Sequence, residues 1–387
     1  MRIIMHIDVN NAFLSWEAIY LLNQGYKYDI RNSYAVIGGD EEQRRGIVLA
    51  KSNAAKKLGI KTAEPLYQAR KKCRVLKVYK PHFEFYYEMS NKLFKLISKY
   101  TPDIEKASVD ECYIDYTKVE YLHGNPLEFA KKLQLEIKET LGFTVNIGIA
   151  NNKLCAKMAS DFSKPFKIHT LFDNEIQEKM YILPIEELFG IGRKTAPKLR
   201  NLGINTIGDL ANFDVNLLSR YFKNQAIKMI ESAKGIDNSE VISEVYDPKG
   251  ISHSTTLKHD LTKKQDVYKV LNEISEQLGI EIRKKNKYAS VINTFIKNSD
   301  FIVTSHQMKL DNPTNNTKVI YETSKNLLDE MWKEERIRLV GIRLDRLTDK
   351  RREQLSIFEE VSVKDNDDKL EKVVDSLKEK YGKNIIK

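Results

Sequence analysis

Short apolar runs and segments with helical periodicity alternate along the first half of the chain. Residues 3–9 form an apolar run that carries Asp8 near its end, which predicts a buried strand. Residues 84–100 carry apolar side chains at helical spacing, so we expect an amphipathic helix there. Two short extended runs follow at 104–108 and 112–116, and each predicts a strand.

A further helix, strand and helix complete this half. Asn125 and Pro126 supply a cap and a first turn, and Gly142 supplies a stop signal, so we expect a helix between them. Residues 143–150 alternate as a strand does, and residues 152–161 predict another helix.

The order of these elements predicts where the acidic residues meet. With residues 15–82 set aside as an inserted mixed α/β subdomain, the order is β-α-β-β-α-β. In this split arrangement the first and second strands run parallel, with the third between them. The end of the first strand and the turn between the next two therefore share one sheet edge. Asp8 lies at the first place and Asp110 and Glu111 at the second, so we expect side-chain contact.

The second half of the chain repeats the same order of elements. A helical, glycine-punctuated region over 183–235 leads into a polar linker at 239–250. Residues 298–300 occupy the turn equivalent to the acidic one but lack the acidic pair, so we expect the same architecture without a metal site. Residues 349–387 are mostly charged and predict a tail with one short helix. The repeated elements are strand 252–257, helix 264–284, strands 288–297 and 301–310, helix 317–334 and strand 336–345.

Composition narrows the class of protein. Charged residues make up 30% of the chain, and no apolar run approaches the about 18–20 residues of a membrane span, so we expect no membrane association. Cys73, Cys112 and Cys155 are far apart and odd in number, which fits a reducing, cytoplasmic compartment. With 64 Lys and Arg against 54 Asp and Glu, the net charge of +10 favours a polyanionic partner.

The acidic residues indicate metal chemistry. Three carboxylates at one sheet edge cannot all stay ionised unless a cation compensates them. Mg²⁺ prefers hard oxygen ligands, and two such ions can activate an attacking oxygen and stabilise a leaving pyrophosphate. The alternative interpretation is that Asp110 and Glu111 form an ordinary polar turn.

Five ordered motifs resemble those of bacterial Y-family (DinB/UmuC-type) translesion DNA polymerases. The resemblance covers residues 1–235 in order and spacing, and residues 250–345 by pattern. The motifs are His6–Phe13, Leu49–Lys61, Ser108–Glu111, Asn146–Lys153 and Ser160–Pro165.

The resemblance implies an α+β, multidomain, right-hand polymerase. It has a ferredoxin-like βαββαβ palm, small fingers, a helical thumb with a helix-hairpin-helix, and a second βαββαβ domain called the little finger. The implied boundaries are palm 1–14 and 83–170, fingers 15–82, thumb 171–238 with the helix-hairpin-helix at 188–204, linker 239–250, little finger 251–347 and tail 348–387.

The family match also implies roles for the carboxylates. Asp8, Asp110 and the backbone carbonyl of Val9 resemble ligands of a nucleotide-binding Mg²⁺ ion. Asp8, Asp110 and Glu111 resemble ligands of a second, catalytic Mg²⁺ ion near the primer 3′-OH. All three carboxylates are therefore predicted catalytic residues.

Nucleotide contacts follow from the same resemblance. Phe13 matches the steric gate, a ring that leaves no room for a ribose 2′-hydroxyl, although a core phenylalanine would look the same. Lys164 matches a lysine that meets the triphosphate, although a surface lysine is the plain alternative. The predicted nucleotide-binding residues are Asn11, Ala12, Phe13, Ala50, Lys56 and Lys164.

The finger motif departs from one branch of the family. The DinB branch has Tyr and Arg where this chain has Asn53 and Lys56, and the run resembles the UmuC branch more closely. A lysine can meet a phosphate but lacks the two-pronged geometry of arginine. The finger contacts to the triphosphate therefore stay open at this point.

Two further motifs indicate partners. Residues 188–199 resemble a helix-hairpin-helix, whose turn brings backbone N–H groups to a DNA phosphate, although an ordinary helical hairpin is the alternative. Residues 354–358 resemble the pentapeptide that binds the bacterial sliding clamp. The predicted DNA-binding residues are Gly190, Gly192, Arg193 and Lys194, and the predicted clamp-binding residues are Gln354, Leu355 and Phe358.

The implied function is low-fidelity, template-directed DNA synthesis past damaged bases without proofreading. The expected partners are primer-template DNA, a dNTP and a sliding clamp, and we expect a monomer. One alternative is a non-catalytic DNA- and clamp-binding accessory protein. Another is a palm-fold nucleotidyl cyclase, because residues 38–41 resemble a GGDEF signature, but Glu42 stands where that signature has Phe.

Overall fold

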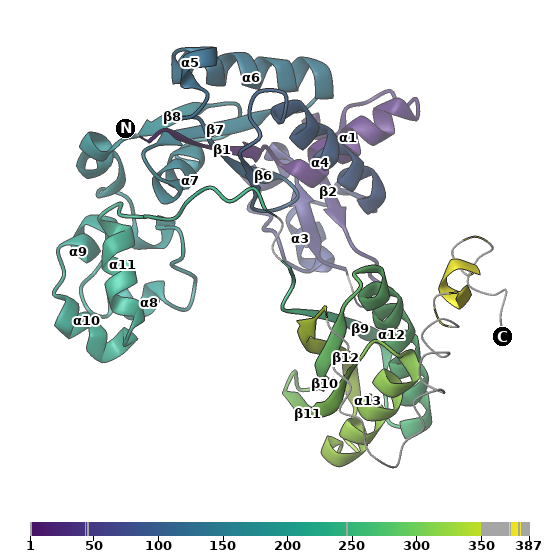
Figure 1. Cartoon of the computed structure of the whole chain (residues 1–387). Coiled ribbons are helices and arrows are strands. Elements are labelled where there is room, and N and C mark those ends of the chain that lie inside the picture. The colour runs from purple at the N-terminus through teal and green to yellow at the C-terminus, as the bar shows by residue number, and fades with distance from the viewer. Residues whose placement is uncertain are drawn as a thin grey trace. The chain divides into compact units, whose positions relative to one another are not determined.

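The computed structural model describes residues 2–42, 44, 46–244, 247–349, 371, 373–377 and 380. The chain divides into two compact units. The first unit comprises residues 1–39 and 47–245, and the second comprises residues 40–46 and 246–387. Figure 1 shows the helices and strands of both units, coloured along the chain from the N-terminus to the C-terminus.

A five-stranded sheet forms the centre of the first unit. Its order is β5 (Ile104–Lys106), β6 (Glu111–Asp115), β1 (Ile4–Val9), β7 (Val145–Ala150) and β8 (Ile168–Leu171). β6 is antiparallel to both β1 and β5, so β1 and β5 run parallel with β6 between them, as predicted. β8 lies parallel to β7 at the edge and was not expected.

Helices cover both faces of this sheet. α4 (Phe83–Ile97) and α6 (Pro126–Leu141) share a core with Met5, Ile7 and Val9 of β1. α7 (Lys153–Asp161) packs on the opposite face, where Ile4 joins a second core. Alternation along β1 therefore turns His6 and Asp8 toward α7.

The predicted start and stop of α6 are confirmed. The Asn125 side chain accepts hydrogen bonds from the backbone N–H groups of Leu127 and Glu128, and Pro126 occupies the first turn. Gly142 ends the helix with a φ of 77°, a left-handed conformation that favours glycine.

The inserted segment is a small α/β layer, as expected. Its three strands form one sheet, in the order β3-β2-β4, with β4 parallel to β2. The expected boundary between residues 14 and 15 falls inside the first helix, which packs against α4. The elements are α1 (Ala12–Asn23), β2 (Ala35–Gly38), β3 (Val48–Lys51), α2 (Asn53–Lys57), α3 (Leu66–Lys72) and β4 (Lys77–Tyr79).

Short helices make up the region after β8. They share the hydrophobic core of α7, so this helical part is packed onto the α7 face of the sheet. The helices are α8 (Ala196–Arg200), α9 (Ile207–Ala211), α10 (Val215–Phe222) and α11 (Gln225–Ala233), and a separate short helix, α5 (Glu120–His123), precedes α6.

The three cysteines lie in three different parts of the first unit. Cys73 belongs to the core under the small sheet, Cys112 to the core beneath α4 and α6, and Cys155 to the core around α7. All three are buried free thiols. Burial raises the pKa of Cys112 and of Cys155 to about 12.

The second unit has the predicted order of elements but a different strand order. Its sheet runs β11-β10-β12-β9, so the first strand lies at the edge beside the fourth, whereas in the first unit the first strand lies between the third and the fourth and pairs with both. The expectation of identical architecture was wrong, because an order of elements does not by itself choose strand partners. The elements are β9 (Gly250–Leu261), α12 (Lys264–Lys284), β10 (Tyr288–Asn298), β11 (Val303–Thr314), α13 (Thr317–Met331) and β12 (Ile337–Thr348).

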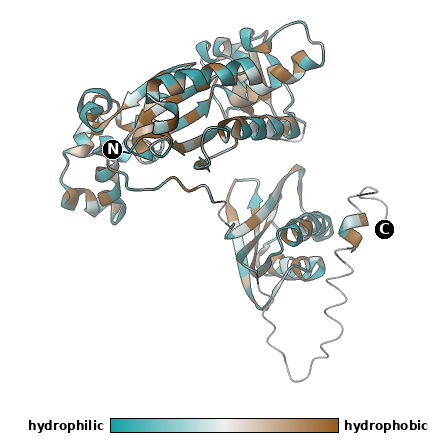
Figure 2. Ribbon diagram, turned by 45° about the horizontal axis from the view of Figure 1, so that its top comes forward, coloured by the Kyte–Doolittle hydropathy of each residue, from teal (hydrophilic) through white to brown (hydrophobic). Residues whose placement is uncertain are grey.

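Both helices of the second unit pack on one face of its sheet. α12 contacts β9 and β12, and α13 contacts β10 and β11. The covering helices carry mostly hydrophilic residues on the side turned away from the strands (Figure 2). Helical residues 371 and 373–377 agree with the expected short helix in the tail. The predicted clamp peptide, 354–358, lies outside the described residues.

None of the helices in the described part of the chain is both long and apolar enough to cross a membrane.

Gly148 tests the close packing of α7 on β7. A Cβ atom at this position would lie 2.0 Å from the carbonyl oxygen of Ala156 and 2.5 Å from the amide nitrogen of Ser160. Because both atoms are backbone, Gly148→Ala must displace α7, and we expect a loss of stability of about 1–3 kcal/mol. Gly192→Ala is the control, since a Cβ there meets nothing within 4 Å. Equal unfolding midpoints in urea for the two variants would contradict this packing.

Candidate active site

Strand pairing brings two of the predicted carboxylates together. Asp8 of β1 stands opposite Glu111 of β6, and alternation turns both side chains toward α7. The backbone N–H of Val9 donates to the carbonyl oxygen of Asp110 at 3.0 Å, which fixes the turn against the end of β1. Asp8 is only 9% exposed, so its charge needs a partner.

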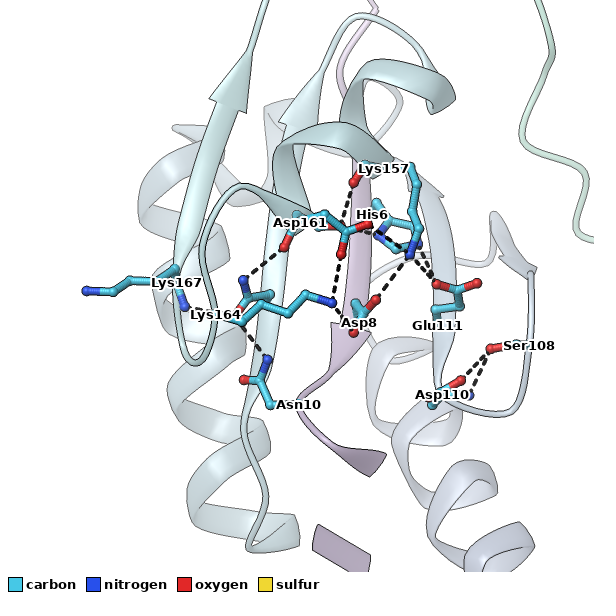
Figure 3. A network of polar contacts seen from close by, with 12 residues as sticks. His6, Asp8, Asn10, Ser108, Asp110, Glu111, Lys157, Asp161, Lys164 and Lys167 are labelled. Atoms are coloured by element: carbon cyan, nitrogen blue, oxygen red, sulfur yellow. Dashed lines mark hydrogen bonds and ion pairs between the residues drawn. The ribbon is translucent and has the colours of Figure 1, made fainter. Parts of the chain in front are cut away.

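Two lysines supply positive charge to these carboxylates (Figure 3). Lys157 Nζ on α7 lies 2.6 Å from Glu111 Oε2 and 3.2 Å from Asp8 Oδ2. Lys164 Nζ lies 3.0 Å from Asp8 Oδ1. Asp161 pairs with both lysines, at 3.5 Å and 2.8 Å. The neighbouring carboxylates raise the pKa of Lys157 and of Lys164 despite the opposing effect of burial, so both remain charged.

His6 adds a buried ring to the same group. Its Nδ1 lies 2.8 Å from Ser160 Oγ, and its Nε2 lies 3.4 Å from Glu111 Oε2. Burial lowers the pKa of His6, which favours the neutral ring. The adjacent His6 ring and the Lys157 ammonium lower the pKa of Glu111 to about 2, so this carboxylate stays ionised at neutral pH.

Asp110 lies apart from this group and faces a cavity. Its Oδ1 accepts a hydrogen bond from Ser108 Oγ at 2.6 Å. Burial raises the pKa of Asp110, and the charges of Asp8 and Glu111 add to that rise, although Ser108 opposes it. His6, Asp8 and Glu111 each offer one atom that could bind a metal, and these three atoms lie within 4.8 Å of one another, whereas Asp110 is outside that group.

The cavity beside Asp110 contains four of the predicted nucleotide-binding residues. It has a volume of about 250 Å³. Lys56 is exposed on α2 and is not among the lining residues of this cavity, whereas Lys51 is. The lining residues are Asn11, Ala12, Phe13, Leu49, Ala50, Lys51, Thr62 and Asp110.

Lys51 is the cationic side chain that the finger motif places in the cavity. Its Nζ donates to Thr62 Oγ1 at 2.8 Å. Burial, together with the charge of Lys56, lowers the pKa of Lys51. Lys51 directly follows Ala50 on β3, and neighbouring strand residues ordinarily turn to opposite faces, so no sequence pattern indicated that both would line the cavity.

A left-handed turn directs the chain from the carboxylates into the cavity wall. Asn11, between β1 and α1, has a φ of 48°, a conformation that asparagine tolerates better than most residues. Its side-chain amide donates to Asn53 Oδ1 at 3.3 Å, which joins this turn to α2. Phe13 then follows within the first turn of α1 and lines the cavity.

The predicted DNA-binding turn is exposed. Gly190 has a φ of 95°, and Cβ atoms at Gly190 or Gly192 would meet nothing within 4 Å. Arg193 and Lys194 are exposed beside them, before α8. The turn is therefore open to a partner.

The donor set fits divalent cations. Asp8, Asp110 and Glu111 offer hard carboxylate oxygens, and two ammonium groups meet the negative charge where those oxygens gather. His6, Lys51, Thr62, Lys157 and Asp161 belong to the site, but the sequence interpretation had assigned none of them a role. The spacing of Lys157 and Asp161, four residues apart on a helix, was a signal for a shared face.

Comparison with known families covers most of the chain. Residues 7–161 match the impB/mucB/samB family, and residues 248–357 match the impB/mucB/samB family C-terminal domain. Residues 173–204 match the IMS family HHH motif.

Curated relatives align along the full length. The DNA polymerase IV of Clostridium acetobutylicum is 45% identical over 386 residues, which cover 100% of this chain and 97% of the relative. The DNA polymerase IV of Oceanobacillus iheyensis is 35% identical, over 100% of this chain and 91% of the relative.

Solved structures share the fold. A Y-family DNA polymerase chimera of Dbh and Dpo4 matches with a TM-score of 0.77 and 27% identity, over 89% of this chain and 99% of that chain. A ternary complex of Dbh matches with a TM-score of 0.62 and 26% identity, over 89% and 98% of the two chains. The sequence and the fold agree, and this chain belongs to the Y-family of DNA polymerases.

Proposed function

We propose that this polymerase adds deoxynucleotides to a primer by a two-metal-ion mechanism, with low fidelity and with bypass of damaged template bases. One observation carries the proposal: the Asp8–Glu111 pair lies beside a cavity that Asp110 and Phe13 both line. Asp110 thus lies between the paired carboxylates and the cavity in which a nucleotide would bind.

The carboxylates would hold the two Mg²⁺ ions. Asp8, Asp110 and the carbonyl of Val9 would hold the ion that accompanies the triphosphate, and Glu111 would complete the ligands of the catalytic ion. When bound, these ions lower the pKa of the primer 3′-hydroxyl and neutralise charge on the leaving pyrophosphate. The low pKa of Glu111 keeps it ionised and ready to bind a cation.

The lysines would orient the triphosphate. Lys51 presents its ammonium to the cavity from β3, and Lys164 presents its own beside Asp8. Both reach phosphate as point charges rather than through the fork of an arginine. We assign Lys51, rather than Lys56, the finger contact, because Lys51 lines the cavity.

The finger side of the cavity supports tolerance of damaged templates. Ala50, Thr62 and Leu49 are the finger residues there besides Lys51, and none is aromatic. Small side chains leave room above a distorted base pair. The same looseness would lower fidelity on intact DNA.

DNA binding would use the exposed turn at Gly190 and Gly192, with Arg193 and Lys194 beside it. Backbone N–H groups and basic side chains at such a turn contact phosphates without reading sequence. Clamp binding through 354–358, action as a monomer, a cytoplasmic location and the lack of proofreading remain expectations from the family.

The alternatives fit the site less well. An accessory protein that had lost catalysis would not need the complete carboxylate set. A cyclase would place residues 38–41 at the metal site, yet Gly38 ends β2 in the small sheet rather than in the sheet that carries Asp8.

Removal of the metal ligands tests the mechanism. We expect Asp110→Asn and Glu111→Gln each to reduce primer extension with dNTPs and Mg²⁺ at least about a hundredfold, since each removes charge that the ions require. Asp115→Asn, at the far end of β6 from Glu111, is the matched control and should extend normally. The assay is run on intact and abasic-site templates. Unchanged extension by either site variant would overturn the mechanism.

Phe13→Ala tests the steric gate. Removing the ring opens the cavity wall, so we expect incorporation of ribonucleotides relative to deoxynucleotides to rise at least about tenfold. The measurement is the ratio of kcat/KM for the two sugars opposite one template base. If the ratio stayed at the wild-type value, Phe13 would be only a core residue.

Arg193 and Lys194 test the phosphate contacts. We expect the double substitution Arg193→Ala, Lys194→Ala to weaken binding of all duplexes alike. The slope of log affinity against log salt should fall by about one for each lost contact. Lys131→Ala, an exposed lysine on α6 outside the motif, serves as the control. A steep, unchanged slope in the double variant would place the DNA elsewhere.

A further inference from the structure

The cavity ring of Phe13 rests on a second aromatic ring. Phe13 on α1 and Tyr86 on α4 stack with centroids 5.1 Å apart and ring planes inclined by 23°. Phe83 packs edge-on against both rings, at 5.9 Å from each. Tyr86 is buried and is not among the residues that line the cavity, so it supports Phe13 from behind.

A buried carboxylate holds the supporting ring. Glu17 lies one helical turn after Phe13 on α1, and its side chain is only 1% exposed. The hydroxyl of Tyr86 donates to Glu17 Oε2 at 2.5 Å. His82 Nδ1 lies 2.9 Å and 3.1 Å from the two oxygens of Glu17, and its ring stacks on Tyr20 at 4.0 Å.

The buried Glu17 carboxylate lowers the stability of the fold, so we looked for what it holds in place. Burying a carboxylate in a protein interior destabilises the fold unless the carboxylate is paired and hydrogen-bonded. A hydrophobic residue at position 17 would pack between α1 and α4 without that cost. What the carboxylate adds is a short, charge-assisted hydrogen bond, which restrains the tilt and depth of the Tyr86 ring. Burial and the carboxylate raise the pKa of Tyr86, so its hydroxyl remains a donor.

We propose that Glu17 and Tyr86 are positioning residues for Phe13, and that they set how strictly the cavity rejects a ribose 2′-hydroxyl. The proposal rests on the proposed function of the cavity. Phe13 stacks on a ring that is fixed by one hydrogen bond to the helix that also carries Phe13. Loosening that bond lets the two rings shift together, and displacements of about 1 Å at a substrate contact can change rates by about a hundredfold.

Tyr86→Phe tests the proposal with minimal disturbance. It keeps the stacked ring and removes only the hydroxyl, while Glu17 keeps its contacts with His82. We expect the ratio of ribonucleotide to deoxynucleotide kcat/KM to rise several-fold, by less than in Phe13→Ala. The rise should come from a lower KM for the ribonucleotide, with kcat for the deoxynucleotide near the wild-type value. Glu17→Gln should shift the ratio in the same direction.

Tyr116→Phe is the matched control. Tyr116 is also a fully buried tyrosine of this core, and its hydroxyl donates to the carbonyl oxygen of Gly124 at 3.0 Å, away from Phe13. Its sugar ratio should equal that of the wild type. A wild-type ratio in both Tyr86→Phe and Glu17→Gln would overturn the proposal, as would an equal rise in Tyr116→Phe. Failure of the wild-type chain to incorporate dNTPs would instead refute the proposed function.

Discussion

Two like charges forced together by a strand pairing govern the site. The register of β1 and β6 sets Asp8 opposite Glu111 on the face that α7 covers. The two residues therefore stay neighbours as long as the sheet is intact. The repulsion is relieved by Lys157, which α7 can deliver only because Gly148 lets that helix approach β7 closely. The strand register therefore depends on the close packing of α7, because that packing brings the compensating charge to the two carboxylates. The proposed cation site depends on the same packing.

The central sheet and the positions of its carboxylates were predictable because hydrophobic periodicity indicates the strands and helices, and their order along the chain indicates which strands lie together. Apolar runs and caps located nearly every element of the palm, and the split β-α-β rule placed Asp8 beside Glu111. Lys157 was not predictable, since its contact depends on how closely α7 packs, which no local pattern records. The expectation that the second unit repeats the first was wrong for a related reason. Strand pairing is decided by tertiary contacts, and these strands have similar sequence patterns.

In the cavity, too, some residues could be named from sequence motifs, whereas others are recognised only from how the chain packs. Family resemblance located Phe13, Ala12 and Ala50, but it favoured Lys56, and only the path of β3 reveals that Lys51 faces inward. Glu17 escaped prediction altogether, because a charged residue on a helix is ordinarily assigned to solvent. Its burial depends on partners, Tyr86 and His82, that lie more than sixty residues away in the chain. Buried polar groups of this kind become visible only in three dimensions.

The buried cysteines give the molecule three built-in reporters. Each thiol lies in a different hydrophobic core: Cys73 under the small sheet, Cys112 beneath α4 and α6, and Cys155 around α7. The nucleophile in alkylation is the thiolate, and burial keeps Cys112 and Cys155 protonated at neutral pH. Alkylation of each cysteine therefore requires its own core to open. The order in which the three become labelled traces which part of the enzyme loosens first.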